Sequence, residues 1–265
     1  MIDIDTIMHT VTANARTASR AMARVGDATK SGALHNAAQN LRSCTDDILA
    51  ANAKDIAAAV ERGLSGAMLD RLMLDAGRIA DICNAIDAVA DLADPVGQVI
   101  DRRERPNALV MERVRVPIGV LGIIYESRPN VTADAAALGL RSGNAVILRG
   151  GSEAVHSNRA IHAAMAAGLS QAGLPEHAVQ LIPTQDRAAV GAMLRAQGAI
   201  DMIIPRGGKS LVARVQDEAR VPVLAHLDGI CHSFVDASAT QVMAEAIIVN
   251  AKMCVPAYAA QPKHC

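Results

Sequence analysis

Up to Pro95, the first proline, apolar and polar positions alternate with the period of an α-helix. Apolar side chains recur at steps of three and four residues, as expected for helices that bury one face. Such stretches are found at 4–25, 48–60 and 69–92. Thr45 is placed to cap the second helix and Gly63 to end it. We therefore predict that residues 1–95 form a helical segment that packs on the domain after it.

Beyond Pro95 the period changes. Residues 96–116 hold two β-prone runs on either side of a polar Pro106-Asn107 turn, which predicts a β-hairpin. Short, continuously apolar runs then alternate with alanine-rich helical stretches; the runs are IGVLGIIY, NAVILRG, AVQLIP, DMIIPR and PVLAHL. Continuous hydrophobicity is typical of parallel strands that are buried on both faces. The pattern therefore predicts an α/β fold, in which helices cover both faces of a parallel sheet.

Composition narrows the class of protein. Apolar residues make up 51% of the 265 residues, and 26 basic side chains are balanced by 27 acidic ones. This balance gives no electrostatic footprint for nucleic acid or an anionic membrane, and no apolar run is long enough to span a bilayer. The N-terminus lacks a secretory apolar block. The five cysteines include no CxxC pair, which favours a reducing cytoplasm and predicts no metal site.

Ligands of open parallel sheets bind beyond the carboxyl ends of the strands, where loops lead into helices. The first such junction is YESRPNVTAD, in which Pro129 stiffens the turn and Asn130 stands at a helix start. The Asn130 amide is suited to donate to a developing oxyanion. The alternative is structural, with Asn130 or Thr132 simply capping the helix.

The second junction is VILRGGSEA. Gly150 and Gly151 would let the backbone approach a ligand closely, and Ser152 would start the next helix. Arg149 would lie beside that helix start, where its guanidinium suits a phosphate. The alternative is a glycine turn, a cap and a solvated arginine.

The third junction, IIPRGGKSL, ends like the phosphate-binding loop GxxxxGK[ST]. That motif requires a glycine where Ile203 stands, and Pro205 would lie inside the loop, so a P-loop is not expected. No GxGxxG is present either. What remains is a generic anion cradle at a helix start, formed by Arg206, Gly207, Gly208 and Lys209.

A fourth stretch, AHLDGICH, carries His226 and Cys231 at or just past a strand end. A cysteine and a histidine together suggest a nucleophile with its base, or metal ligands. Alternation along a strand points neighbouring side chains to opposite faces, and a lone cysteine in an apolar run is usually part of a core. The core interpretation of Cys231 is favoured.

Three of these stretches resemble one family. VPIGVLGIIYESRPNVTADAAALGLRSGNAVILRGGSEAVHSN, DMIIPRGGKSLVARV and VPVLAHLDGICH are similar to the gamma-glutamyl phosphate reductases (glutamate-5-semialdehyde dehydrogenases) of the aldehyde dehydrogenase superfamily. The resemblance extends from the N-terminal helices to Met253. It implies an aldehyde-dehydrogenase-like fold with a Rossmann-like, NADP-binding domain over 117–253. It also implies NADPH-dependent reduction of L-glutamyl 5-phosphate to L-glutamate 5-semialdehyde and phosphate, a step of proline biosynthesis that proceeds through a cysteine thioester.

The resemblance also implies roles for single residues. Asn130 would be the oxyanion donor. Arg149 and Ser152 would lie at the adenosine ribose, where an arginine beside a hydroxyl suits the 2′-phosphate of NADP(H). Gly207 and Gly208 would lie near the pyrophosphate. His226 departs from the superfamily, because it stands where many members have a glutamate general base. Reduction of an acyl phosphate does not need such a base.

The end of the chain departs most from the family. The family's nucleophilic cysteine follows an Asn-Ala-Lys element in a Gly-Val-Cys stretch, whereas here Lys252-Met253 leads into CVPAYAAQPKHC. Cys254 comes too early, and Cys265, the last residue, has no scaffold to lower its pKa. We therefore expect 254–265 to be an unrelated tail from a shifted reading frame, with most of the catalytic domain missing.

Such a chain would not reduce glutamyl phosphate by itself. The alternative function is a non-catalytic module that binds NADP or dimerises. In that case the hairpin at 96–116 would pair with a second copy, giving a homo-oligomer.

Overall fold

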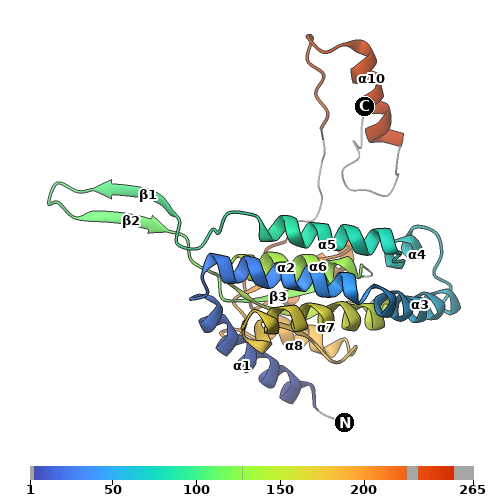
Figure 1. Ribbon diagram of the computed structural model, residues 1–265, viewed down its shortest axis with the longest axis horizontal. Coiled ribbons are helices and arrows are strands. Elements are labelled where there is room, and N and C mark those ends of the chain that lie inside the picture. The colour runs from blue at the N-terminus through green and yellow to red at the C-terminus, as the bar shows by residue number, and fades with distance from the viewer. Residues whose placement is uncertain (1–2, 127, 226–231, 254–265) are drawn as a thin grey trace. The chain divides into compact units, whose positions relative to one another are not determined.

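The computed structural model describes residues 3–126, 128–225 and 232–253. The chain forms two compact units, Met1–Leu224 and Ala225–Cys265. The second unit contains helix α10 (Gln241–Met253). The first unit holds the sheet and the helices around it (Figure 1). No helix in the described ranges is long and apolar enough to cross a membrane.

The segment before Pro95 is helical, as its periodicity predicted. Its helices are α1 (Ile4–Met22), α2 (Asp27–Ser43), α3 (Thr45–Glu61), α4 (Ala67–Leu72) and α5 (Ala76–Ala90). The apolar stretch at 69–92 is divided because Asp75 starts a new helix, its carboxylate accepting a hydrogen bond from the Arg78 N–H. Gly63, with φ +80°, follows the end of α3 as expected.

The prediction that Thr45 caps α3 is wrong. Cys44 holds the cap position, and Thr45 is already helical. The Thr45 hydroxyl instead donates to the Arg42 carbonyl at 2.8 Å. The reason is that a single residue separates α2 from α3, so the hydroxyl reaches back to the open carbonyl groups that end α2.

The hairpin lies where the sequence placed it. Strands β1 (Val99–Glu104) and β2 (Val110–Val114) pair antiparallel around the Pro106-Asn107 turn. All but one of their eleven residues are exposed. In Figure 1 the hairpin projects from the helices of its unit.

The four strands of the sheet are parallel, in the order β5-β4-β3-β6. They are β3 (Val120–Tyr125), β4 (Ala145–Arg149), β5 (Val179–Leu181) and β6 (Met202–Arg206). Helices α6 (Asn130–Arg141), α7 (Val155–Gln171) and α8 (Ala188–Arg195) connect them, and α9 (Lys209–Glu218) follows β6. The expected α/β fold is therefore confirmed.

Pro205 lies in β6, as the apolar run DMIIPR predicted, and is a buried residue opposite Ile124. A proline is tolerated there because its nitrogen points, like the Ile203 N–H two residues earlier, to the outer side of β6, where the structure shows only an isolated bridge. The last predicted strand differs from expectation. In the described part of PVLAHL, which ends at Ala225, the structure shows only an isolated bridge between Val223 and Ile203.

Side chains alternate between two cores, one on each face of the sheet. On one face, Leu121 and Ile123 join a cluster that includes residues of α2, α5, α6 and α7. On the other face, Val120 and Ile124 join residues of α1 and α8. Helices therefore cover both faces, as predicted.

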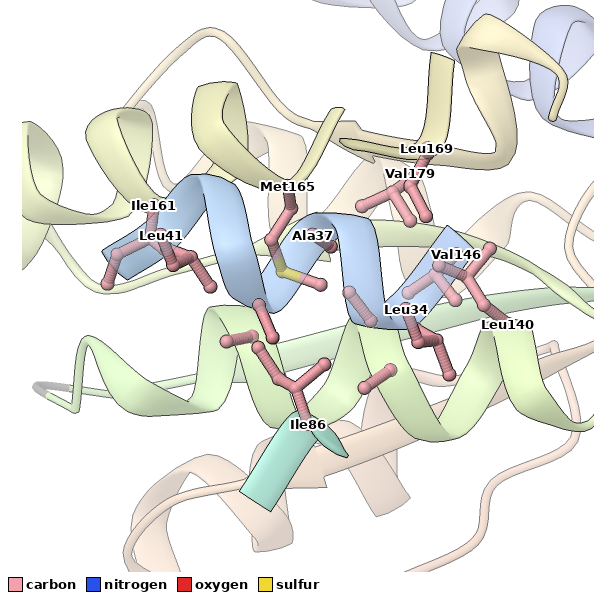
Figure 2. Close-up of a cluster of buried hydrophobic side chains, with 14 of the residues drawn as sticks. Leu34, Ala37, Leu41, Ile86, Leu140, Val146, Ile161, Met165, Leu169 and Val179 are labelled. Atoms are coloured by element: carbon pink, nitrogen blue, oxygen red, sulfur yellow. The ribbon is translucent and has the colours of Figure 1, made fainter. Parts of the chain in front are cut away.

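Figure 2 shows the centre of the first core, where α2 lies against α7. Leu34 and Leu41 from α2 and Ile161 and Met165 from α7 are all 1% exposed or less. Burying one such side chain contributes about 1.5–3 kcal/mol. The two helices come close because Gly168 has no Cβ, which would lie 2.4 Å from the Ala37 backbone nitrogen.

A buried ion pair ties α2 to the base of the hairpin. The Lys30 ammonium is 1% exposed and lies 2.6 Å from an Asp94 carboxylate oxygen. The second Asp94 oxygen accepts the Val96 N–H at 3.0 Å. Burial alone would raise the pKa of Asp94, but the Lys30 and Val96 hydrogen bonds, with Arg141 nearby, hold it below its usual range.

Candidate cofactor site and active site

A hollow of about 310 Å³ opens at the carboxyl ends of β3 and β4, on the face that α1 and α8 cover. We call it the cofactor hollow. Its polar and charged lining comes from four loops and helix starts, and it includes Glu126, Arg149, Ser152, Glu153, Gln185, Arg187, Ser210 and Arg214. The predicted residues Arg149, Gly151 and Ser152 thus share one hollow with residues from the first turns of α9.

Arg149 is the buried cation of this hollow. It is 9% exposed, and it donates from Nη1 to the Gly150 carbonyl at 2.8 Å and from Nη2 to the Gln185 carbonyl at 3.1 Å. Its Nε has no hydrogen-bond partner. Burial lowers the pKa of Arg149, the nearby Glu153 carboxylate raises it, and the charges of Arg187 and Arg214 lower it further. The alternative of a solvated arginine is therefore wrong.

Two side chains that pack against Gly150 leave no room for a Cβ at this position. A Cβ there would lie 2.2 Å from Asn158 Nδ2 and 3.0 Å from the Tyr125 ring. Buried hydrogen bonds fix these side chains: the Tyr125 hydroxyl pairs with the Thr132 hydroxyl at 2.7 Å, which donates to Asn158 Oδ1 at 3.0 Å. Burial raises the pKa of Tyr125 to about 12. Close packing therefore suffices to require glycine at 150, and its role toward a ligand stays a prediction.

Ser152 opens a short 3₁₀ helix, Ser152–Ala154, that leads into α7. Its side chain is exposed and caps no helix, because it donates to the Glu153 carboxylate at 3.1 Å. The hydroxyl therefore stays on the surface of the cofactor hollow.

At the start of α9, where the sequence predicts an anion cradle, a carboxylate of the chain itself accepts a hydrogen bond. The Gly208 N–H donates to Glu126 Oε2 at 2.8 Å. A Cβ on Gly207 would lie 2.6 Å from the same oxygen. Lys209, the first residue of α9, is exposed. The structure thus shows that this helix start accepts an anionic oxygen.

Asn130 is the first residue of α6, on the opposite face of the sheet from the cofactor hollow. Neither Asn130 nor Thr132 caps the helix, so the structural alternative is wrong. Asn130 Nδ2 donates to Asp134 Oδ2 at 2.9 Å. Burial is the main cause that raises the pKa of Asp134, against the Asn130 hydrogen bond and the charge of Arg206.

Arg206 belongs with Asn130 rather than with the cofactor hollow. Both line a second hollow, of about 460 Å³, which is largely apolar and also includes Arg128. Alternation along β6 explains this, because residue 206 follows residues 202 and 204 to the α6 face.

Sequence reasoning missed Glu126, Arg187 and Arg214. Glu126 directly follows β3, so its position at a strand end was a usable signal. Arg187 immediately precedes α8, and Arg214 lies five residues into α9, where sequence spacing alone did not distinguish it from a solvated surface arginine.

The remaining candidates, His226, Cys231, Cys254 and Cys265, lie outside the described residues. Within the described ranges, no group of three or more His, Cys, Asp or Glu side chains could hold a metal ion.

Comparison with known proteins places the chain in a family. The model of the aldehyde dehydrogenase family matches residues 4–255, and the chain belongs to this family. It is 70% identical over 241 residues to a gamma-glutamyl phosphate reductase of Sphingopyxis alaskensis, covering 91% of this chain and 56% of that protein. The chain thus spans about half the length of the curated relatives it matches.

Solved structures of gamma-glutamyl phosphate reductases share the fold of this chain. A gamma-glutamyl phosphate reductase of Thermotoga maritima superposes with a TM-score of 0.89 at 41% identity, covering 96% of this chain and 62% of the other. The enzyme of the same name from Saccharomyces cerevisiae gives a TM-score of 0.77 at 34% identity, covering 94% and 63%.

Proposed function

We propose that this chain is the nucleotide-binding part of a gamma-glutamyl phosphate reductase. The whole enzyme would convert L-glutamyl 5-phosphate, NADPH and a proton into L-glutamate 5-semialdehyde, phosphate and NADP⁺, a step of proline biosynthesis. The observation that carries the proposal is the 70% identity over 241 residues to a protein of that name, over a segment that includes both hollows. The substrate is a small molecule, and the cysteine pattern favours the cytoplasm.

The cofactor hollow fits NADP(H). Arg149 offers an unpartnered Nε at its buried end. Arg187 and Arg214 lie close enough to Arg149 to depress its pKa. The three arginines share about 310 Å³ with the carboxylates of Glu126 and Glu153, and Arg214 also pairs with Glu218 at 2.9 Å. Their guanidinium groups can donate charge-assisted hydrogen bonds to a phosphate at the 2′ position, which a neutral ribose hydroxyl would not receive. Ser152 adds a hydroxyl on the same surface.

At the other face, Asn130 would act on the reacting carbonyl. An asparagine amide has two N–H donors. One is held by Asp134, which fixes the orientation of the amide, and the second can donate to the carbonyl oxygen as negative charge develops on it. NADPH, when bound, supplies the hydride that reduces the acyl group. Asp134 is thus a positioning residue, and Asn130 is the group in contact with the reacting atoms.

A second candidate function is a non-catalytic module that binds NADP or dimerises, and the hairpin favours it. Both of its strands expose apolar side chains: Val99, Ile100, Val110, Met111 and Val114 are each at least 42% exposed. Pairing with a second copy would bury them and give a homo-oligomer.

One experiment separates the two functions. NADPH is titrated into the purified chain by fluorescence, and phosphate-dependent reduction of NADP⁺ is then assayed with L-glutamate 5-semialdehyde. Binding without turnover is expected for the 265-residue chain alone and supports the module. Turnover that is lost in Cys254→Ser would assign the full reaction to this chain. Absence of NADPH binding would contradict the proposed function and the NADP-binding form of the module, and would leave only the dimerising form.

A further inference from the structure

A third hollow, of about 280 Å³, lies next to Asn130 and shares no residue with the cofactor hollow. Helices α4 and α5 form one wall and α6 forms the other. Its charged and amide-bearing lining consists of Arg71, Arg78, Asp81, Asn130 and Asp134. We call it the head-group hollow. It carries two guanidinium groups and two carboxylates, whereas the hollow on the other side of Asn130 is mostly apolar.

The α4–α5 wall is fixed before any ligand arrives. Arg78 donates to the Met73 carbonyl at 2.8 Å and pairs with the Asp70 carboxylate at 2.6 Å. The loop beneath it is held by Asn52, 2% exposed, which donates to the Leu72 carbonyl at 2.9 Å and accepts the Leu74 N–H at 2.8 Å. The Arg78 guanidinium and the loop at 72–74 are thus held in place, so they lose little entropy when a ligand binds.

The α6 wall offers a carboxylate at the reacting end. Asp134 is half-buried, and its side chain is hydrogen-bonded to the neutral Asn130 amide. The charge of Arg206 partly offsets the cost of burying this carboxylate, and a ligand that brings a positive charge would offset it further. Asp81, on α5, is exposed at the opposite wall and adds a second negative charge to the same hollow.

We propose that the head-group hollow binds the α-ammonium and α-carboxylate of an amino-acid substrate whose reacting carbonyl lies at Asn130. Arg71 receives the carboxylate, and Asp81, with Asp134, receives the ammonium. The inference rests on the proposed function, and it names the part of the substrate that gives specificity. The α-carbon of a glutamyl group is three carbon–carbon bonds from its reacting carbonyl, so one end can lie at Asn130 while the other occupies the adjoining hollow.

The test uses three probes that differ in charge. L-Glutamate carries both head groups, glutarate lacks the ammonium, and 4-aminobutyrate lacks the α-carboxylate. Each is titrated into the ¹⁵N-labelled 265-residue chain, and backbone amide shifts are followed by NMR. We expect saturable shifts at residues 71–85 and 130–134, with L-glutamate binding at least about tenfold more tightly than either analogue.

Two substitutions test which side chain binds the carboxylate and which binds the ammonium of the ligand. Arg71→Gln should weaken L-glutamate and glutarate and leave 4-aminobutyrate unchanged. Asp81→Asn should weaken L-glutamate and 4-aminobutyrate and leave glutarate unchanged. The matched control is Arg24→Gln, an exposed arginine at the end of α1, which should change none of the three affinities. Equal affinities for all three probes, or shifts confined to other regions, would overturn the proposal.

A second titration keeps this result apart from the proposed function. NADPH is added to the same sample, and its shifts are expected at 149–153 and 206–214. Shifts with NADPH but none with L-glutamate would refute the head-group hollow and leave the proposed cofactor site standing. Shifts with L-glutamate but none with NADPH would do the reverse.

Discussion

The Glu126 carboxylate closes the start of α9 by accepting the Gly208 N–H at 2.8 Å. A helix start carries partial positive charge and unpaired N–H groups, so it attracts anions. The family resemblance implies that the pyrophosphate of a dinucleotide lies at this position, where the structure shows the chain's own carboxylate. Under the proposed function, cofactor binding and the Glu126 contact would therefore compete for the same donor.

The first prediction concerns that competition. Glu126→Gln keeps a hydrogen-bond acceptor but removes the negative charge that opposes a pyrophosphate. We expect NADPH to bind about two- to fivefold more tightly, since a charge at a helix start is worth about 0.3–1 kcal/mol. Fluorescence titration measures the change.

The matched control is Asp217→Asn, which removes one negative charge from an exposed position near the other end of the same helix. It should leave the affinity unchanged. Weaker NADPH binding by Glu126→Gln would mean that Glu126 helps to hold the cofactor, contrary to a competing role.

The second prediction concerns the arginines that sequence reasoning missed. Arg214→Gln and Arg187→Gln should each weaken NADPH binding by about three- to tenfold, and should leave NADH binding unchanged, because only NADPH carries the 2′-phosphate. Binding of both cofactors is measured by fluorescence. Arg220→Gln, an exposed arginine just after α9, is the control. An equal loss for both cofactors would place the cluster at a different part of the dinucleotide.

The sequence predicted the fold well because its signals are local. Helical period before Pro95, the turn at Pro106-Asn107 and the apolar runs after 117 each need only neighbours along the chain. Thr45 shows where local signals fail, because the preceding helix ends at Ser43, two residues earlier, and offers open carbonyl groups. Nothing within the stretch around Thr45 encodes that proximity.

The site was predictable only where strand ends meet, as at Arg149. The strand order β5-β4-β3-β6 determines which loops share a hollow, and no single segment of the sequence predicts that order. The strand order brings Arg214, from the helix after β6, beside Arg149. Arg206, expected beside Gly207, lies on the face of Asn130 because side chains alternate along β6.

The third prediction concerns pH and the buried Asp94–Lys30 pair. The folded-state pKa of Asp94 is depressed, so its contribution to stability is present above the unfolded-state pKa and is lost as pH falls through the folded-state value. Asp94→Asn leaves Lys30 buried without its partner, which should cost about 3 kcal/mol at neutral pH. Urea unfolding at several pH values measures the difference.

The difference between Asp94→Asn and the parent chain should shrink in acid. Replacing both residues, with Lys30→Met and Asp94→Asn together, should recover most of the loss at neutral pH, because no buried charge is left unpaired. A constant deficit from neutral pH to acid would show that the pair contributes through packing rather than charge.

The last prediction compares one substitution at two helical glycines. Gly168 on α7 faces the α2 backbone, and an added Cβ would lie 2.4 Å from Ala37 N and 2.5 Å from Ala37 Cα. A backbone cannot rotate away as a side chain can, so Gly168→Ala must push the helices apart and should destabilise the fold by about 1–3 kcal/mol. Gly32 on α2 has nothing within 4 Å of the same added atom.

Gly32→Ala should therefore stabilise the chain by about 0.5–1 kcal/mol, because alanine restricts the unfolded chain and favours a helix. The intrinsic helix preference is the same at both sites, so the opposite signs isolate the α2–α7 contact. Urea unfolding of the two variants measures both values, with equal slopes confirming comparable transitions. If Gly168→Ala were as stable as the parent, α2 and α7 would have to lie farther apart than the structure shows, and the core in Figure 2 would be more loosely packed.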